Sequence, residues 1–451
     1  MNTSRETSPS KAVLALATIQ WIAFTLANVI TVPIVLGHAF GLSPHNTGLY
    51  LDQTLIACGA VGILQVLLGH RYPIIEGPAG TWWGVTLVLI QMTKETGGSL
   101  PDLLRQLELG LIVAGLVAVL LAAFGLLGFL RRLFTPIVTG TFMLLLSLQL
   151  SRSMVAGILG LDSGGNVVHV RIAILAVLLI AFTVILMVKG PGMVKSLAVL
   201  IGLAVGWGVF AIFGLSPGAP GHAGPAFALP QVFPWGTPQA QSGILITCAI
   251  TMVVLMSNLI TSIQVMGRAN RERPDGASFV RGTFMTGFGT AIAGAVGAVG
   301  NIPLSVSASL VDLTGIGERL PFLISSVVIL VLGMLPAVGH FAAGLPAPVG
   351  YAVLFAIYGQ LLGFALRDFK GLALNQRDLF IIGIAVLSGV GIFFVPSTAW
   401  RTLPPMAAYL LDNGLIVGVV LVLILEHLVF RKGASPSPSP SPSPSTARPD
   451  S

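Results

Sequence analysis

Long apolar runs of about twenty residues, separated by short polar or Gly/Pro-containing segments, dominate the chain. The runs show neither the period-2 alternation nor the shorter length that is typical of barrel strands. A helix of this length crosses the hydrocarbon core of a bilayer and satisfies its own backbone hydrogen bonds there. The pattern therefore predicts an all-α integral membrane protein.

Runs bounded by Gly, Pro and charged residues predict about fourteen transmembrane segments. They are expected near 12–37, 47–69, 74–93, 106–129, 132–158, 169–188, 193–214, 240–265, 279–299, 302–317, 319–340, 347–366, 378–397 and 407–430. We divide them into a first seven-span repeat over 12–214 and a second over 240–430. Residues 1–11 are a predicted cytoplasmic N-terminus, and the Ser/Pro alternation within 431–451 predicts a disordered cytoplasmic tail.

The basic residues indicate how these spans are oriented. With both termini in the cytoplasm, 5 of the 23 Lys and Arg residues fall outside and the other 18 fall inside. The five outside are Lys94, Arg105, Arg152, Arg171 and Arg401. This bias is the one that the positive-inside rule describes. We therefore expect a multi-pass protein of the cell inner (plasma) membrane with both termini cytoplasmic.

Composition excludes several classes of protein. Only 9% of residues are charged and 55% are apolar, whereas a soluble surface needs about 25% charged residues. The net charge of +7 comes from basic residues scattered between apolar runs, which predicts no nucleic-acid-binding face. The histidines lack metal-ligand spacing, and Cys58 and Cys248 lie inside separate apolar runs. We therefore expect no enzymatic site, metal, cofactor or disulfide.

Gly and Pro interrupt two of the predicted spans, the third and the tenth. The third reads EGPAGTWW over 76–83, and the tenth reads GNIPLSVSAS over 300–309. Pro removes a backbone donor and Gly permits non-helical backbone, so each span is expected to hold a short extended stretch before a half-helix. Such breaks at matching places in two halves are typical of inverted-repeat transporters with a binding site near the midplane. Pro-kinked packing helices are the alternative.

These segments resemble the nucleobase:ascorbate transporter family (nucleobase:cation symporter-2), especially its uracil/xanthine permease branch, from about Gln20 to Phe430. Gln20-Trp21 followed by Pro33 is similar to the family's Gln-His start, with Trp21 in place of His. Asn258, followed by GRAN at 267–270, is similar to a motif that usually begins with Glu. Residues 300–309 lie over the signature Gln-Asn-x-Gly-x-x-x-x-Thr-Gly/Arg, which Asn301 matches.

The resemblance implies two inverted seven-span repeats, a core domain that holds the substrate, a gate domain, and short strands at the breaks in spans 3 and 10. It also implies a secondary active transporter for a nucleobase such as xanthine, uracil or urate, coupled to protons or sodium. Because Asn258 replaces the family's carboxylate, an uncoupled facilitator stays open. A homodimer stays open too, since the small residues of 287–300 can pack helices within one chain or between two.

A nucleobase is a flat ring with hydrogen-bond donors and acceptors on its edges, so its site needs amides, free backbone groups and an aromatic surface. The predicted substrate-binding residues are Asn258, Asn301, Gly80, Thr81, Trp82, Ser305, Ser307 and Gln20. Structural alternatives are open for several of them. Asn258 and Gln20 can make interhelical hydrogen bonds, Asn301 can brace the unwound backbone, and Trp82 can lie at the membrane interface.

Carboxylates within spans are expensive and indicate function. Glu76 lies beside the third-span break, and Asp312 lies about two turns into the tenth-span half-helix. These two residues are the candidates for carrying a coupling proton. The main rival function is transport of an anion such as sulfate or bicarbonate by the same seven-plus-seven fold, because opposed half-helix N-termini also bind anions. The half-helices contain no Arg, which favours the nucleobase.

Overall fold

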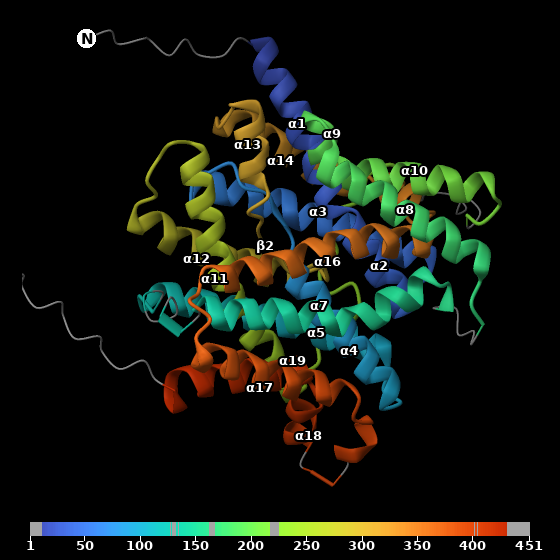
Figure 1. Ribbon diagram of the computed structural model, residues 1–451. Coiled ribbons are helices and arrows are strands. Elements are labelled where there is room, and N and C mark those ends of the chain that lie inside the picture. The colour runs from blue at the N-terminus through green and yellow to red at the C-terminus, as the bar shows by residue number, and fades with distance from the viewer. Residues whose placement is uncertain are drawn as a thin grey trace, which may run out of the picture.

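Helices make up nearly all of the regular structure (Figure 1). The computed structural model describes residues 11–126, 128, 132–133, 135–161, 167–216, 225–400, 402–403 and 405–430. The predicted tail over 431–451, and all of the predicted N-terminal segment except residue 11, lie outside this part of the chain.

The first half of the chain contains nine of the labelled helices and one strand. They are α1 (Lys11–Val29), α2 (Thr31–Phe40), α3 (Pro44–Leu67), β1 (Glu76–Pro78), α4 (Gly80–Glu95), α5 (Leu100–Ala123), α7 (Pro136–Ile158), α8 (Val170–Lys189), α9 (Gly192–Ser196) and α10 (Ala198–Ile212).

The second half contains further helices and the second strand. It contains α11 (Ser242–Ala269), α12 (Gly276–Ala295), β2 (Asn301–Pro303), α13 (Ser307–Thr314), α14 (Arg319–Gly333), α15 (Pro336–Ala342), α16 (Ala347–Lys370), α17 (Gln376–Phe393), η2 (Ser397–Trp400), α18 (Pro405–Asp412), α19 (Gly414–Ile424) and η3 (Leu425–Val429).

Membrane-spanning character is clear from helix length and composition. Six helices in the described ranges are long and apolar enough to cross a bilayer, and α14 with α15, bent by 80°, makes a seventh. Shorter apolar helices, such as α10 and the first part of α16, fall at further predicted spans. Within the described residues, each predicted span overlaps one or more helices, or a strand followed by a helix. The count of fourteen crossings stays a prediction, because several of these elements are too short to span alone.

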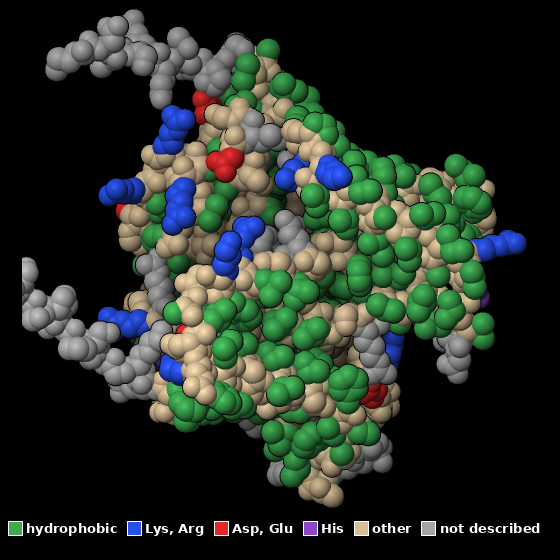
Figure 2. Space-filling view, in the orientation of Figure 1, with side chains coloured by type: hydrophobic (Ala, Val, Ile, Leu, Met, Phe, Trp, Pro, Cys, Tyr) green, Lys and Arg blue, Asp and Glu red, His purple; other side chains and the backbone are tan. Residues whose placement is uncertain are grey.

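The surface is largely apolar, as a lipid-facing surface should be. Figure 2 shows hydrophobic side chains over most of one face, with few charged groups among them. Helix α8 is an example: Ile174, Leu178, Ile185 and Val188 are all more than half exposed. Exposed aliphatic side chains along a whole helix are unfavourable in water and favourable in hydrocarbon.

Helix packing follows a two-fold repeat. α12 packs along α5, and α14 packs along α3. These helices fall at predicted spans two (α3), four (α5), nine (α12) and eleven (α14). If the chain is split into two halves of seven spans, α3 corresponds to α12 and α5 corresponds to α14. The two pairs are then equivalent. The contacts of α11 with α5 and of α1 with α14 are related in the same way. A two-fold repeat of the predicted spans is therefore visible in which helices touch.

Two groups of helices can be separated by their contacts. The core group comprises α1 to α5 and α11 to α15, and the flanking group comprises α7 to α10 and α16 to α19. Within the flanking group α16 runs along α7, and α17 lies against α19. Figure 1 shows α17, α18 and α19 together at one end of the view, and α13 and α14 with α1 at the other.

Glycine pairs allow the closest helix contacts of the core group. A Cβ on Gly115 of α5 would lie 2.3 Å from the carbonyl oxygen of Gly287, and a Cβ on Gly287 of α12 would lie 2.6 Å from that of Gly115. No side chain fits at such distances. The glycines of the 287–300 segment therefore pack helices within one chain, and Gly287 is the example.

The two short strands confirm the prediction for the interrupted spans. β1 and β2 pair antiparallel, with Glu76 opposite Pro303 and Pro78 opposite Asn301. The pairing extends beyond the strands, because Leu304 N–H donates to the Ile75 carbonyl at 2.9 Å. Pro78 and Pro303 contribute no N–H to the ladder, and each strand leads into a half-helix, α4 or α13. Segments more than 220 residues apart thus meet inside the core group.

Candidate functional site

The register of the two strands puts the side chains of Glu76, Pro78, Asn301 and Pro303 on one face of the ribbon. Glu76 is 1% exposed and Asn301 is fully buried. Among the described residues, neither Glu76 carboxylate oxygen nor either polar atom of the Asn301 side chain has a hydrogen-bond partner. Buried polar groups are almost always satisfied. This face of the ribbon therefore has unused hydrogen-bonding capacity.

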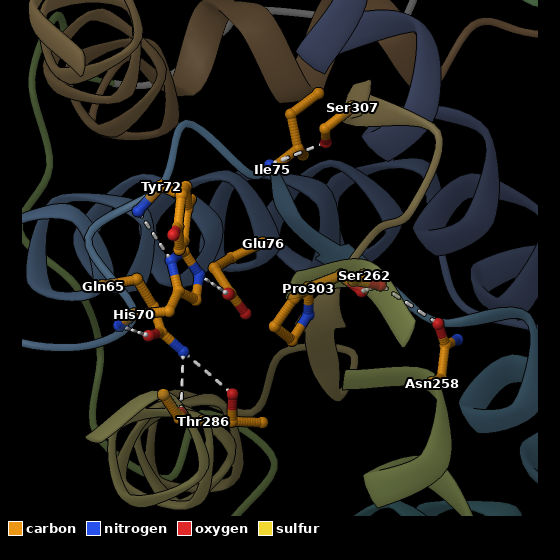
Figure 3. A network of polar contacts seen from close by, with 11 residues as sticks. Gln65, His70, Tyr72, Ile75, Glu76, Asn258, Ser262, Thr286, Pro303 and Ser307 are labelled. Carbon is orange, nitrogen blue, oxygen red and sulfur yellow. Dashed lines mark hydrogen bonds and ion pairs between the residues drawn. The ribbon is translucent and has the colours of Figure 1, made fainter. Parts of the chain in front are cut away.

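Glu76 belongs to a buried polar network between α3 and α12 (Figure 3). His70 Nε2 lies 3.6 Å from Glu76 Oε1. The Gln65 amide oxygen accepts from the His70 backbone N–H at 3.3 Å, and its Nε2 donates to Thr286 Oγ1 at 2.8 Å and to the Gly282 carbonyl at 3.1 Å. The network joins the end of α3, the first strand and α12.

The protonation of His70 follows from its backbone contact. The Tyr72 N–H donates to His70 Nδ1 at 3.0 Å, so this nitrogen carries no proton. The neutral imidazole therefore has its proton on Nε2, the nitrogen that faces Glu76. A second proton on Nδ1 would break the contact with Tyr72. His70 is thus held as a neutral imidazole, with its Nε2 proton facing Glu76 at a distance of 3.6 Å between Nε2 and Oε1.

Asn258 lies half-buried on α11, one turn before a contact with the second strand. Its Oδ1 lies 3.3 Å from the Ser262 hydroxyl, and that hydroxyl donates to the Pro303 carbonyl at 2.8 Å (Figure 3). The one hydroxyl proton of Ser262 serves the shorter contact with Pro303, so the 3.3 Å contact does not orient the amide. The Nδ2 group of Asn258 has no protein acceptor in the described structure, so the amide keeps hydrogen-bonding capacity for a ligand. Ser257, its neighbour, bonds within its own helix to the Val254 carbonyl.

The N-terminus of α4 has free amides. Its N-cap, Ala79, provides no side-chain cap. No described group accepts from the N–H groups of Gly80, Thr81 and Trp82, whereas Trp83 N–H already donates to the Ala79 carbonyl. Such an end attracts carbonyl oxygens and anions.

The two tryptophans of α4 point to different neighbours. Trp82 is 2% exposed, and a Cβ on Gly300 would lie 2.8 Å from its ring, so it packs inside the core group. Trp83 instead meets Tyr358 of α16 edge-on, at 4.3 Å between ring centroids. The Tyr358 hydroxyl donates to the Gly80 carbonyl at 2.6 Å. Trp83, rather than the predicted Trp82, therefore lies where the core group meets the flanking group.

The start of α13 is organised differently from that of α4. The N–H groups of Ser307, Ala308 and Ser309 donate to the carbonyls of Leu304, Ser305 and Val306. The Ser307 side chain is fully buried and accepts from the Ile75 N–H at 2.9 Å, so it braces the first strand. Ser305 is partly exposed, and its N–H has no acceptor among the described residues. Ser305 is thus better placed than Ser307 to meet a ligand.

Two further predicted residues lie away from this centre. Gln20 on α1 is half-buried, and its Nε2 donates to Met193 Sδ of α9 at 3.2 Å, which is an interhelical contact. Asp312 is exposed near the C-terminal end of α13. Of the two carboxylates predicted to carry a proton, only Glu76 is buried in a polar network.

Sequence reasoning missed Gln65, His70 and Tyr358. His70 and Gln65 stood at the end of a predicted span, where polar residues are ordinary. A signal for Tyr358 was available, since a tyrosine inside an apolar span needs a partner for its hydroxyl. The sequence does not show that this partner is the carbonyl of Gly80, which lies 278 residues away.

Known proteins agree with this fold. The transmembrane domain of the cyanobacterial bicarbonate transporter BicA superposes with a TM-score of 0.59 at 17% identity, over 90% of this chain and 97% of that one. At this identity the likeness shows the shared fold alone.

Relatives in sequence identify the family. YwdJ of Bacillus subtilis, whose name assigns it to the purine permeases, is 34% identical over 90% of this chain and 94% of its own length. The xanthine permease of the same bacterium is 23% identical over 92% and 93%. A family model named Xan_ur_permease, described as the permease family, matches residues 12–398. The chain therefore belongs to the xanthine/uracil permease family, the nucleobase:cation symporter-2 family of multi-pass membrane transporters.

Proposed function

We propose that the chain is a secondary active permease for a nucleobase such as xanthine, urate or uracil, and that it transports the base together with a proton. The observation that carries the substrate assignment is the position of Asn258. Its side-chain amide lies half-buried beside the paired strands, next to a Ser262 hydroxyl whose proton serves the Pro303 carbonyl. An amide in this position can meet the C=O and N–H edge of a base, because it offers both a donor and an acceptor.

The surroundings of Asn258 supply the other contacts that a base needs. Free N–H groups at the start of α4 suit the carbonyl oxygens of xanthine or urate, and Ser305 adds a hydroxyl from the other half-helix. Trp83 and Tyr358 give an aromatic wall on the side of the flanking group. The named activity of the relatives as purine or xanthine permeases supports the same substrate class.

Glu76 is our candidate for the coupling proton. Glu76 is the buried carboxylate of the paired strands β1 and β2, and the Nε2–H group of the neutral His70 points toward it. A carboxylate in this position is stable when protonated, or when it gains a donor as the site changes shape. Asn258 stands where the family usually has Glu, and Glu76 would supply the carboxylate that is missing at that position. An uncoupled facilitator is the alternative.

Anion transport is the second candidate, since the fold is shared with a bicarbonate transporter. Its support is the free N-terminus of α4. Against it, neither half-helix has a basic residue in its first turn, and the amide and aromatic groups match a base better than a small oxyanion.

The test is uptake of radiolabelled xanthine, urate and uracil by proteoliposomes with an imposed pH gradient, for the wild type, Asn258→Ala and Ser257→Ala. We expect saturable uptake of one base, and a loss of about tenfold or more in Asn258→Ala, since a buried hydrogen bond left unmade costs about 1–3 kcal/mol. Ser257→Ala is the matched control, because its hydroxyl bonds within the helix. Collapse of the gradient with a protonophore should stop accumulation.

Uptake of sulfate or bicarbonate, with no uptake of any base, would replace this assignment with the anion function. Equal loss in both variants would show that Asn258 has no special role. Accumulation that persists with the protonophore but follows a sodium gradient would exclude proton coupling.

A further inference from the structure

A small cavity lies at a second buried carboxylate, away from Glu76 and Asn258. It is lined by Glu108 of α5, Trp82 of α4, Tyr50 of α3, and Trp235 of the segment that leads to α11. Its volume of about 20 Å³ is room for one water-sized occupant. In the orientation that the charges predict, α3 and α5 begin at the external side, so this cavity lies about two turns below that surface.

Glu108 is 2% exposed, and its hydrogen bonding is incomplete. Oε1 accepts from the Trp235 backbone N–H at 3.3 Å, whereas Oε2 has no partner among the described residues. The nearby charged groups are Arg105, one turn earlier on α5, and Asp102, with which Arg105 forms an ion pair. From α3 the only titratable side chain at the cavity is Tyr50. Glu108 therefore has no ion pair with any residue that the structure describes.

Trp82 supplies the complementary group. Its indole Nε1–H is buried without an acceptor in the part of the chain that the structure describes. Glu108, whose Oε2 lacks a donor, and Trp82, whose indole N–H lacks an acceptor, thus line the same cavity. Both deficits are removed by one molecule that accepts from the indole and donates to the carboxylate. Water does this, whereas a metal cation would face the positive end of the N–H bond.

Trp235 covers the cavity in a fixed position. Its Nε1 donates to the Gly297 carbonyl at 2.8 Å, and its ring meets Tyr50 edge-on at 5.6 Å. Gly297 has a φ of +63°, and a Cβ there would lie 2.6 Å from Trp235 Nε1, so the turn accepts only glycine. The connection between the two repeats is thereby tied to the carboxylate that it covers.

We propose that Glu108 and Trp82 hold a water molecule and form an external proton-loading site. A hydronium ion that reaches the cavity passes a proton through this water to Glu108 Oε2, which becomes a neutral carboxylic acid. The indole keeps its proton throughout and only orients the water. Release is the reverse transfer to water. Glu108 is then the group that samples external pH, separately from Glu76.

The position of Trp82 connects this site to the candidate substrate site. Trp82 lies in the first turn of α4, directly after Gly80 and Thr81, and its ring packs on Gly300 beside Asn301. A change in the charge of Glu108 therefore acts on the half-helix end that we assign to the base. This link rests on the proposed permease function, whereas the protonation of Glu108 does not.

Infrared difference spectra between acidic and alkaline pH test the protonation without any substrate. We expect a protonated-carboxyl band that is lost in Glu108→Gln and shifted in Trp82→Phe, because the water then lacks its donor. Asp102→Asn, which removes a partly exposed acid of the same helix, should leave the band unchanged. If Glu108→Gln is poorly folded, the shift of the carboxyl band in Trp82→Phe is the result that tests the proposal. A band that both variants leave unchanged would overturn the proposal.

Transport provides the second readout. In Glu108→Gln we expect gradient-driven uptake of the base at low external pH to fall at least about tenfold, because the amide cannot take up a proton. Exchange of labelled for unlabelled base without a gradient should stay near the wild-type rate. Loss of sodium-driven uptake instead would indicate a metal-cation site and overturn the proposal. If the wild type carries no base, the permease function fails while the spectra still test Glu108.

Discussion

At the scale of single residues, two buried carboxylates are the main candidates for proton transfer. Glu76 and Glu108 are both almost completely buried, and each has at least one oxygen without a donor in the described structure. Asp312, which looked equivalent to Glu76 along the sequence, is exposed. Charged groups within a membrane are rare unless they face a cavity or a partner. Function at this scale therefore depends on which carboxylates are enclosed.

Replacing Glu76 tests the coupling proton. In Glu76→Gln we expect base accumulation against a gradient to be lost, because the amide can no longer exchange a proton, while exchange of base across the membrane continues. Asp312→Asn is the matched control and should accumulate base like the wild type. Uptake as a function of imposed pH gradient is the measurement. Loss of accumulation in Asp312→Asn alone would show that Asp312 of α13, rather than Glu76, carries the coupling proton.

Tyr358 gives a second prediction for a single atom. Removing its hydroxyl in Tyr358→Phe leaves the ring contact with Trp83 but frees the Gly80 carbonyl. We expect the apparent affinity for the base to change by about fivefold to tenfold, the effect of one hydrogen bond of about 1 kcal/mol or slightly more. The KM of uptake is the measurement. An unchanged KM would show that this contact does not influence the site.

At the scale of elements, helix ends and helix contacts decide the arrangement of the core group. The N-cap of α12 is Asp275, whose carboxylate accepts from the Ser278 N–H at 2.7 Å and from the Ser278 hydroxyl. The contact of α12 with α5 depends on Gly115 and Gly287. These local features hold α12 where Thr286 can bind Gln65 of the polar network.

The Asp275 cap should give stability a pH dependence. The Ser278 hydroxyl and N–H lower the pKa of Asp275 below its ordinary value of 3.8. Its contribution is therefore complete above pH 3.8 and is lost as the pH falls through the lowered pKa. We expect Asp275→Ala to reduce the melting temperature in detergent at neutral pH and to match the wild type in acid. Asp275→Asn keeps the cap without titrating, so an identical acid loss in that variant would contradict this explanation.

The α5–α12 contact should be intolerant of a methyl group. In Gly115→Ala the new Cβ would meet the Gly287 carbonyl and the backbone of residue 291, so the helices must separate. We expect a loss of about 1–3 kcal/mol, as for other overpacked contacts. Thermal unfolding of the purified protein measures it. Gly128→Ala is the control, since nothing lies within 4 Å of a Cβ there. Equal stability of the two variants would contradict the close contact.

At the scale of the whole molecule, the core group and the flanking group meet at α4. A Cβ on Gly84 of α4 would lie 3.3 Å from Leu146 Cγ of α7, and Tyr358 of α16 reaches Gly80. Transporters built of inverted repeats work by moving one bundle against the other around a central site. The α4 interface is then one of the surfaces that must slide or open.

A cross-link at this interface tests the movement. We expect the double variant Gly84→Cys with Leu146→Cys to form a disulfide on oxidation and to stop uptake, because the groups can no longer move apart. Uptake should return on reduction. Base binding, measured by equilibrium dialysis, should persist in the oxidised state. Each single Cys variant is a control. Undiminished uptake by the cross-linked protein would show that this interface stays closed during transport.

The sequence by itself determined the class of the protein and the course of its chain. Apolar run length dictated helices in lipid, and Gly with Pro at 77–78 and 300–303 dictated the two breaks, because these are local consequences of backbone chemistry. Tertiary structure alone decided which side chains face each other. The register of β1 against β2 turned Glu76 and Asn301 to one face, and helix packing enclosed Glu76 while leaving Asp312 exposed. His70, Gln65 and Tyr358 acquired partners from distant segments, and such pairings depend on the packed fold rather than on any local pattern.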